Sequence, residues 1–246
     1  MIKNKKGIIF GIANDHSIAW GIAKKLTEHG AEIGISYQNE NVLKRVKPLA
    51  EKINNDFLIE CDFSKTESIK NSFKEIKKKF DNIDFVIHAA AFSDKNELNG
   101  KYFNTSKDNF INTLNISCFS FTEIAKYASE IMNDGGSLLT LSFYGSNKVM
   151  PNYNVMGVAK AALETSVKYL SVDLGSKNIR VNAISAGPMR TLSGAAVSNA
   201  RQVYNYTQEN SALKRNVGLE EIGNTALYFV SDLSKAVTGE IHYVDC

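Results

Sequence analysis

Tyr153 and Lys160 are the two residues whose types and spacing point most directly to chemistry. They lie seven residues apart, about two turns of an α-helix, so on a helix they would share nearly the same face. A lysine cation beside a phenol favours the phenolate, and we expect Lys160 to lower the pKa of Tyr153 below about 10. Hydride transfer builds negative charge on a substrate oxygen, which a phenol can stabilise by donating a hydrogen bond. The pair therefore indicates hydride transfer; the alternative is a buried tyrosine and an ordinary surface lysine.

A possible cofactor site precedes this pair in the chain, where an apolar strand ends at Gly11 and a helix starts near Ser17 and Ile18. Gly11 lets the backbone approach a pyrophosphate, and the helix N-terminus offers free N–H groups to an anion. Ser17 can cap the helix, which would stabilise it by about 1 kcal/mol. The next glycine, Gly21, is ten residues on, so the segment departs from the G-x-G-x-x-G pattern. A glycine that ends a strand and a serine that caps a helix remain the alternative.

The ends of the next strands predict which cofactor binds. Gln38 follows the second strand at the position that usually reads the adenosine ribose, and no Lys or Arg follows until Lys44. A 2′-phosphate would lack a bidentate partner there, so we predict NADH and not NADPH. Asp62 closes the third strand, where its carboxylate could accept from the adenine amino group. The alternative is that Asp62 caps the helix that begins near Thr66.

These residues need a scaffold, which the alternation of apolar runs and helical periodicity predicts. The expected strands are Gly7–Gly11, Ile33–Tyr37, Phe57–Cys61, Phe85–Ala91, Ser137–Ser142, Val181–Ser185 and Ile241–Val244. The expected helices lie near 18–29, 40–53, 66–79, 107–133, 152–174 and 219–231. Regular β-α alternation predicts a single-domain, Rossmann-like α/β fold over residues 1–246, with a doubly wound parallel sheet of about seven strands and helices on both faces. The irregular stretches at about 92–105 and 189–218 follow strands and should border the ligand site.

Composition excludes several classes of protein. Of the 246 residues, 43% are hydrophobic and 22% charged, the values of an ordinary globular protein. The three cysteines and four histidines show no metal-ligand spacing, which predicts a reduced, cytoplasmic setting and no metal. The N-terminal apolar run is too short for a signal peptide or a membrane span. The net charge of +3 is spread over helix faces such as 74–79, so we expect no nucleic acid partner.

The sequence resembles the short-chain dehydrogenase/reductase superfamily and, within it, the NADH-type bacterial enoyl-acyl-carrier-protein reductases. The resemblance runs essentially from end to end. Ordinary superfamily members place tyrosine four residues before the lysine, where this chain has Met156. A tyrosine displaced to position 153 is the specific mark of the enoyl reductases. The segments that carry the resemblance are Gly11–Ala13, Ser17–Gly21, Tyr37–Gln38, Tyr153–Lys160, Arg180–Pro188 and Val237–Glu240.

The resemblance implies an activity and a set of site residues. Tyr153 would donate a hydrogen bond to the thioester carbonyl of a trans-2-enoyl-acyl carrier protein while hydride from NADH reaches the β-carbon, as in the reductive step of fatty-acid elongation. The enolate would then be protonated at the α-carbon, and Lys160 would bind the nicotinamide ribose. Met156 and Ser93 would lie near the substrate. The other expected cofactor contacts are Gly11, Ser17, Ile18, Gln38, Asp62, Phe63, Ala90, Met189 and Thr191.

Two other functions are alternatives. An oxidoreductase of the same superfamily that acts on a carbonyl or alcohol is disfavoured by Met156. A catalytically silent dinucleotide-binding protein is disfavoured by the presence of both Tyr153 and Lys160. Many members of the reductase family also carry a second tyrosine where this chain has Phe143, with Tyr144 beside it, and relatives continue past Cys246 through a glycine-containing tail.

The resemblance also implies a homotetramer with closed symmetry, built through the helices near 107–133 and 152–174. Their surplus apolar residues include Leu163, Val167, Leu170 and Val172. Residues 193–210 are small or apolar at helical spacing and are expected to form a mobile lid, with Ala195, Ala196, Val197, Ala200 and Val203 on its apolar side. The nearby Arg201, Lys214 and Arg215 would meet the acidic acyl carrier protein.

Overall fold

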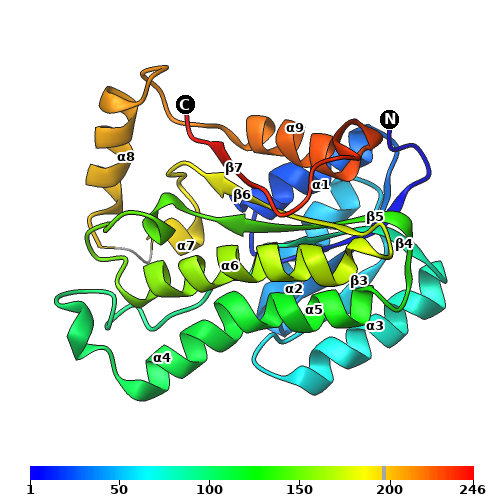
Figure 1. Cartoon of the computed structure of the whole chain (residues 1–246), viewed down its shortest axis with the longest axis horizontal. Coiled ribbons are helices and arrows are strands. Elements are labelled where there is room, and N and C mark those ends of the chain that lie inside the picture. Colours follow the sequence, from blue (N-terminus) through cyan, green and yellow to red (C-terminus); the bar gives the residue numbers. More distant parts are fainter. Residues whose placement is uncertain (196–197) are drawn as a thin grey trace.

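One seven-stranded parallel sheet forms the centre of the molecule. The computed structural model describes residues 1–195 and 198–246. The strand order is β3-β2-β1-β4-β5-β6-β7, with every neighbouring pair parallel, as Figure 1 shows. This confirms the predicted doubly wound sheet. The strands are β1 (Lys6–Phe10), β2 (Glu32–Tyr37), β3 (Leu58–Glu60), β4 (Ile83–His88), β5 (Met132–Ser142), β6 (Arg180–Ala186) and β7 (Ile241–Val244).

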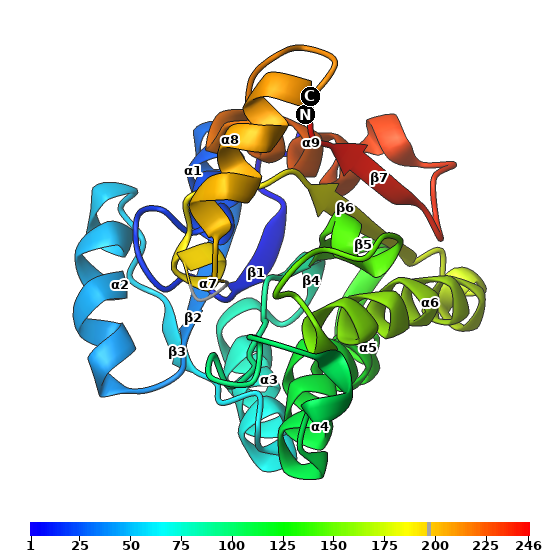
Figure 2. The same ribbon diagram turned by 90° about the vertical axis from the view of Figure 1, so that its left-hand side faces the viewer.

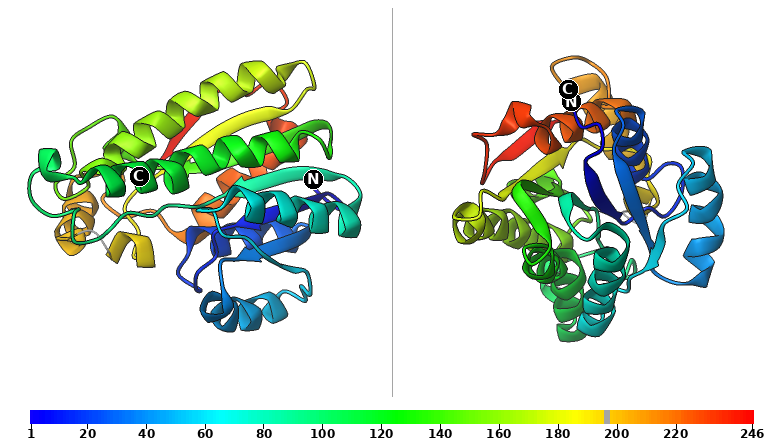
Figure 3. Two further views of the ribbon diagram at one scale, coloured as in Figure 1. Left: turned by 90° about the horizontal axis from the view of Figure 1, so that it is seen from below. Right: turned by 90° about the vertical axis from the view of Figure 1, so that its right-hand side faces the viewer.

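Helices cover both faces of the sheet. One face of the sheet carries α1 (Ile18–Glu28), α2 (Glu40–Lys52) and α9 (Leu219–Val230), whose apolar residues form one buried cluster with the strands. The opposite face carries α3 (Thr66–Phe80), α5 (Ser120–Ala128) and α6 (Val155–Gly175), which form a second cluster (Figures 2 and 3). Two further helices, α7 (Leu192–Ala195) and α8 (Ala200–Asn210), lie at one end of the sheet.

Burial on both faces explains why the strands read as almost continuous apolar runs. In β6 every residue is buried, and in β4 only Asp84 is not. Side-chain caps begin two of the helices: Asn39 accepts from the N–H groups of Asn41 and Val42 ahead of α2, and Ser106 accepts from the N–H of Asn109 ahead of the helix that begins at Lys107. Within the described residues, no helix is both long enough and apolar enough to pass through a membrane.

Two predicted helices differ from the structure. The helix expected over 152–174 begins at Val155, because Asn152 and Asn154 have φ angles of 61° and 39°, which an α-helix does not accept. The helix expected over 107–133 is α4 (Lys107–Leu114), a π-helical turn (Asn115–Phe119) and α5. It ends at Ala128, and the following residues enter β5, where Met132 pairs with Ile83.

The prediction about surplus apolar residues on α6 was wrong in part. Leu163, Val167 and Leu170 are buried in a core cluster of this chain, so they are not surplus to its own packing. Val172 is 79% exposed, and two aromatic side chains on the neighbouring surface, Tyr169 and Phe119, are 73% and 51% exposed. Apolar side chains are therefore exposed on this surface, and Val172 is the one predicted residue among them.

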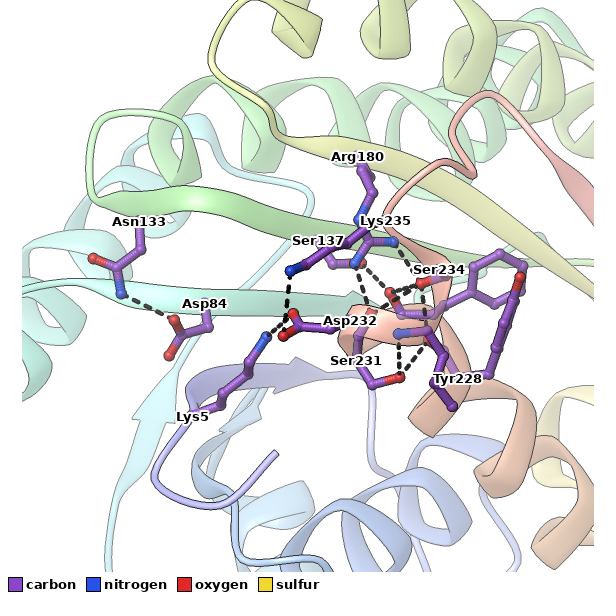
Figure 4. Close-up of polar contacts among 12 residues, drawn as sticks. Lys5, Asp84, Asn133, Ser137, Arg180, Tyr228, Ser231, Asp232, Ser234 and Lys235 are labelled. Carbon is purple, nitrogen blue, oxygen red and sulfur yellow. Dashed lines mark hydrogen bonds and ion pairs between the residues drawn. The ribbon is translucent and has the colours of Figure 1, made fainter. Parts of the chain in front are cut away.

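The amino ends of the strands are closed by polar contacts, shown in Figure 4. Arg180 starts β6 and is 7% exposed, and its guanidinium donates to Ser234 Oγ at 2.8 Å and to the carbonyl of Ser231 at 3.4 Å. At β4, Asp84 accepts from Asn133 Nδ2 at 3.0 Å. These groups satisfy one another.

Candidate active site

A large cavity opens at the carboxyl ends of the strands, where ligands bind in sheets of this kind. Its volume is about 1500 Å³. The walls come from the turn after β1, the residues that follow β4, the end of β5, the start of α6, the residues that follow β6, and α7 with α8. Both stretches expected to border the site do so, at residues 92–95 and 189–192 among others. The second stretch is less irregular than expected, since it contains α7 and α8.

The turn after β1 is shaped for an anion. Gly11 has φ +100°, and a Cβ there would lie 2.3 Å from the carbonyl oxygen of Ala89, so the position requires glycine. Ser17 and Ile18 line the cavity where α1 begins. Ser17 is the N-cap residue, as predicted, but its hydroxyl does not cap α1. It accepts from the N–H groups of Ala13 and Asn14 at 3.0 and 3.1 Å, and so orders the loop before the helix.

The expected cofactor residues divide into two groups. Gly11, Ser17, Ile18, Ala90, Lys160, Met189 and Thr191 all line the cavity. Gln38, Asp62 and Phe63 do not, although they follow β2 and β3, whose carboxyl ends lie at the same edge of the sheet. The structure therefore brings together the group expected around the pyrophosphate and nicotinamide. The expected adenosine contacts lie outside the cavity walls, after the ends of β2 and β3.

Asp62 does not cap α3, which was the alternative to a cofactor contact. Its Oδ1 accepts from the backbone N–H and the hydroxyl of Ser64, at 3.0 and 2.7 Å, and Oδ2 pairs with Lys65 at 3.2 Å. The N-cap position of α3 belongs to Lys65, which has no side-chain cap. Desolvation raises the pKa of Asp62, but the Ser64 hydrogen bonds and Lys65 outweigh it and the pKa is lowered. Asp62 is therefore an ionised acceptor at the end of β3.

Tyr153 lies in the turn before α6, not on the helix. Its ring packs edge-on against Phe143, with centroids 5.0 Å apart, and a Cβ on Gly145 would come within 2.5 Å of the ring. Gly145 therefore lets the chain pass close behind the phenol. Burial, with a smaller contribution from Glu164, raises the pKa of Tyr153 well above 10. The expectation that Lys160 lowers this pKa was wrong, because desolvation and a carboxylate dominate at this position.

Lys160 is 6% exposed and lines the same cavity as Tyr153. Its Nζ donates to the carbonyl of Leu141 at 2.7 Å, at the end of β5. Burial lowers the pKa of Lys160 to about 8, against the opposing effects of Cys118 and Glu164. The ammonium form therefore predominates at neutral pH. The structure thus brings Tyr153 and Lys160 to one cavity, although α6 begins at Val155, after the tyrosine.

The expected substrate residues form an apolar wall with a small polar patch. Met156 is 6% exposed and packs with Leu98 and Val155. Its thioether accepts weakly from Ser117 Oγ at 3.8 Å and supplies no proton. Ser93 also lines the cavity, and its hydroxyl lies 3.0 Å from Thr113 Oγ1.

Phe143 stands at the position of the second family tyrosine, and the neighbouring Tyr144 does not take its place among the described walls of the cavity. Phe143 itself lines the cavity without a hydroxyl. Tyr144 is 41% exposed and packs against Tyr243 of β7, with ring centroids 6.2 Å apart. Tyr153 therefore carries the phenol of this part of the wall.

The far wall comes from the segment after β6. Thr191 Oγ1 accepts from the N–H of Gly194 at 3.0 Å, and the Arg190 guanidinium lies 4.5 Å from the centre of the Tyr204 ring. Leu192, Ala200, Arg201, Val203 and Tyr204 also face the cavity. Of the residues expected on the lid, Ala196 and Val197 lie outside the described residues, as does the side chain of Ala195. The single helix expected there is two helices, and no residue of α8 is buried.

Sequence reasoning missed Glu164, a buried residue of α6 that accepts hydrogen bonds from Ser142, Ser146 and Asn147. Its position four residues after Lys160 was a usable signal, because side chains at i and i+4 lie on one face of a helix. The close packing of Gly145 and Gly157 was also missed: a Cβ on Gly157 would lie 2.8 Å from the carbonyl oxygen of Gly145.

Comparison with known proteins gives a consistent result. A family model described as Enoyl-(Acyl carrier protein) reductase matches residues 11–246. The enoyl-acyl-carrier-protein reductase (NADH) 2 of Rhizobium meliloti is 58% identical, over all of this chain and 91% of the relative. The crystal structure of FabI from Candidatus Liberibacter asiaticus has a TM-score of 0.97 at 57% identity and covers 100% of this chain and 95% of its own. The reductase of Anaplasma phagocytophilum, solved in complex with NAD, has a TM-score of 0.95 at 52% identity, over 100% and 92% of the two chains.

Proposed function

The chain belongs to the enoyl-(acyl carrier protein) reductase family, and from that premise we propose how its residues carry out the reaction. The protein is an NADH-dependent reductase of the trans-2 double bond in enoyl-acyl-carrier-protein thioesters, the reductive step of fatty-acid elongation. One observation carries the assignment of roles: a single cavity is lined by the Gly11 turn, the start of α1, Tyr153 and Lys160.

NADH bound in this cavity would supply hydride to the β-carbon of the substrate. Tyr153 donates a hydrogen bond to the thioester oxygen, on which negative charge develops. The raised pKa of Tyr153 suits this role, because the phenol keeps its proton at neutral pH and remains a donor. The resulting enolate would take up a proton from solvent at the α-carbon. Phe143 and Gly145 fix the ring, so that little reorganisation is needed during the reaction.

The remaining residues hold the cofactor. Gly11 permits the close approach of the pyrophosphate, and the free N–H groups at the start of α1 stabilise its charge. Lys160 binds the ribose hydroxyls next to the nicotinamide, while Met189 and Thr191 cover the opposite side of the same cavity. Gln38 reads the adenosine ribose and favours NADH, since it offers no charge to a 2′-phosphate. Steady-state constants with both cofactors test this point; equal use of NADPH would contradict it.

The decisive experiment follows NADH oxidation with a trans-2-enoyl thioester and, in parallel, with a 3-ketoacyl thioester. We expect turnover with the first and little with the second, because Met156 stands where carbonyl-reducing relatives carry their tyrosine. Faster reduction of the ketoacyl substrate would overturn the assignment. Binding of NADH without oxidation of either substrate would indicate a silent dinucleotide-binding protein.

We also propose a cytoplasmic homotetramer. The exposed side chains of Phe119, Tyr169 and Val172 supply an apolar surface on α6 and the adjoining π-helical turn, of the kind that a closed dimer contact covers. The three free cysteines fit a reducing compartment. Light scattering at micromolar concentration should give four times the chain mass. A monomer mass would contradict the proposal.

The last part of the proposal treats residues 1–246 as one domain in which residues 193–210 form a lid over the acyl pocket. Ala200, Arg201 and Val203 line the cavity from α8, yet α8 buries no side chain. Arg201 is the best-placed contact for an acidic acyl carrier protein. Arg215 is less suited, because both of its terminal nitrogens bind Glu221 at 2.9 and 2.6 Å. Hydrogen exchange of α8 should slow when NAD and a substrate analogue bind; equal exchange with and without them would argue for a fixed wall.

A further inference from the structure

Glu164 is a buried carboxylate that the reaction described above does not use. It lies on α6 and is 8% exposed. Its Oε1 accepts from Ser142 Oγ at 2.5 Å and from Ser146 Oγ at 2.6 Å, and Oε2 accepts from Asn147 Nδ2 at 3.3 Å. In all three contacts the carboxyl group is the acceptor, which is the pattern of the ionised form. A buried charge is costly unless such donors surround it, so the contacts tie the three donors to α6.

The donors belong to one segment, residues 142–147, which forms the wall behind Tyr153. Within it, the Phe143 ring lies edge-on to the phenol, and Gly145 allows the backbone to pass against the same ring. Ser142 and Ser146 flank this contact on either side. A shift of the segment would therefore move the surface against which the phenol rests.

Glu164 also places a negative charge near both catalytic residues. It lies one helical turn after Lys160 and raises the pKa of that lysine, opposing the larger effect of burial. It contributes in the same direction to the raised pKa of Tyr153. Three further elements supply the other titratable groups: Cys118 in the π-helical turn and His88 in β4 interact with Lys160, and Tyr243 in β7 interacts with Glu164.

We propose that Glu164 is a positioning residue for the reduction: it holds residues 142–147 against the Tyr153 ring and sets a negative charge one turn from Lys160. It does not line the described cavity, so it acts through those two residues and not on the substrate. The inference rests on the proposed roles of Tyr153 and Lys160. Glu164 would thus supply two features that Tyr153 and Lys160 do not provide themselves: a nearby negative charge and a fixed surface behind the phenol.

The test compares Glu164→Gln, which keeps the size and loses the charge, with Glu164→Asp and Ser146→Ala, which keep the charge. Glu75→Gln, on the exposed face of α3, is the matched control. Two quantities are measured against pH: kcat/KM with NADH and an enoyl thioester, and the Kd of NADH without substrate. In Glu164→Gln the effect of burial on the Lys160 pKa is opposed only by Cys118, so we expect the alkaline limb of both profiles to move to lower pH. We expect Ser146→Ala to lower kcat several-fold with the limb unmoved, and Glu75→Gln to match the wild type.

Other outcomes overturn the inference. A uniform loss of activity in Glu164→Gln at every pH, with no movement of either limb, would leave Glu164 a purely structural group. Wild-type profiles would remove it from the reaction altogether. If Glu164→Gln does not fold, an unchanged kcat in Ser146→Ala is enough to refute the positioning role. Failure of the wild type to oxidise NADH would instead refute the proposed function, while the pH dependence of NADH binding would still test Glu164.

Discussion

The two ends of the sheet carry polar groups of similar kinds and use them differently. At the amino ends of the strands, Arg180 and Asp84 are held by neighbouring side chains and carbonyls, as Figure 4 shows. At the carboxyl ends, the Tyr153 phenol and the Lys160 ammonium face a cavity of about 1500 Å³. Groups that satisfy one another contribute to stability, whereas groups kept desolvated and turned to a cavity are available for chemistry at a cost in stability.

The largest expected effect is on the rate. Tyr153→Phe should lower kcat about 100- to 1000-fold, because a donor aimed at developing charge is lost, while the melting temperature changes little. Tyr144→Phe is the matched control, since Tyr144 packs against Tyr243 away from the described cavity walls. Steady-state kinetics and thermal melts of both variants provide the measurement. Near-normal turnover in Tyr153→Phe would show that the phenol at the carboxyl end of the sheet is not needed for the reaction.

The second prediction is that removing a functional charge stabilises the fold. Burial lowers the pKa of Lys160 from 10.5 to about 8, so at pH 7 the folded protein holds a proton that burial disfavours. Between about pH 8 and 10.5 the unfolded chain binds more protons at this site than the folded one, and stability should rise with pH. Lys160→Met should therefore raise stability at pH 7, by up to about 3 kcal/mol, and weaken NADH binding.

Denaturant unfolding at pH 7 and at pH 10 measures the Lys160 effect. The gain in Lys160→Met should shrink at the higher pH, where the wild-type lysine is neutral in the folded state. A destabilised variant at pH 7 would show that the contact from Nζ to the carbonyl of Leu141 outweighs the cost of burying the charge.

The third prediction concerns the opposite end. Arg180→Met should lower the free energy of unfolding by about 1–3 kcal/mol, because the guanidinium contacts to Ser234 and Ser231 are lost in a buried setting. The kcat of the folded fraction should not change, since Arg180 starts β6 at the end of the sheet remote from the cavity. Urea unfolding, with kinetics below the transition, tests both parts. A fall in kcat without a loss of stability would contradict the division of roles.

The smallest expected effect is at the surface of that same end. Lys5 pairs with Asp232 at 3.3 Å, but the Asp232 side chain is 66% exposed, so solvent screens the pair. Lys5→Ala should leave the melting temperature and kcat within experimental error of the wild type. A clear loss of stability would mean that surface pairs, and not only buried contacts such as those of Arg180, hold the amino end together.

The sequence predicted the sheet well because parallel strands buried on both faces must be apolar throughout, as β6 is. Residue types and spacing singled out Tyr153 and Lys160, which the structure brings to one cavity. The sequence misplaced the start of α6 because the left-handed conformations of Asn152 and Asn154 cannot be inferred from an apolar pattern. It assigned the wrong direction to the pKa of Tyr153, since desolvation and the position of Glu164 arise only in the folded chain. The π-helical turn carries no sequence signal that periodicity detects.

The π-helical turn at Asn115–Phe119 lets one continuous helical segment direct its side chains to two different places. A π-turn holds one residue more than an α-turn, which advances every later side chain by about 100° around the axis. Before it, α4 turns Asn109 and Thr113 toward the Ser93 loop of the cavity; after it, α5 turns Phe121 and Ile124 into the core. A single-residue deletion within the turn would therefore rotate α5 by about 100° relative to α4. The side chains could then make the contacts of α4 with the Ser93 loop or those of α5 in the core, but not both.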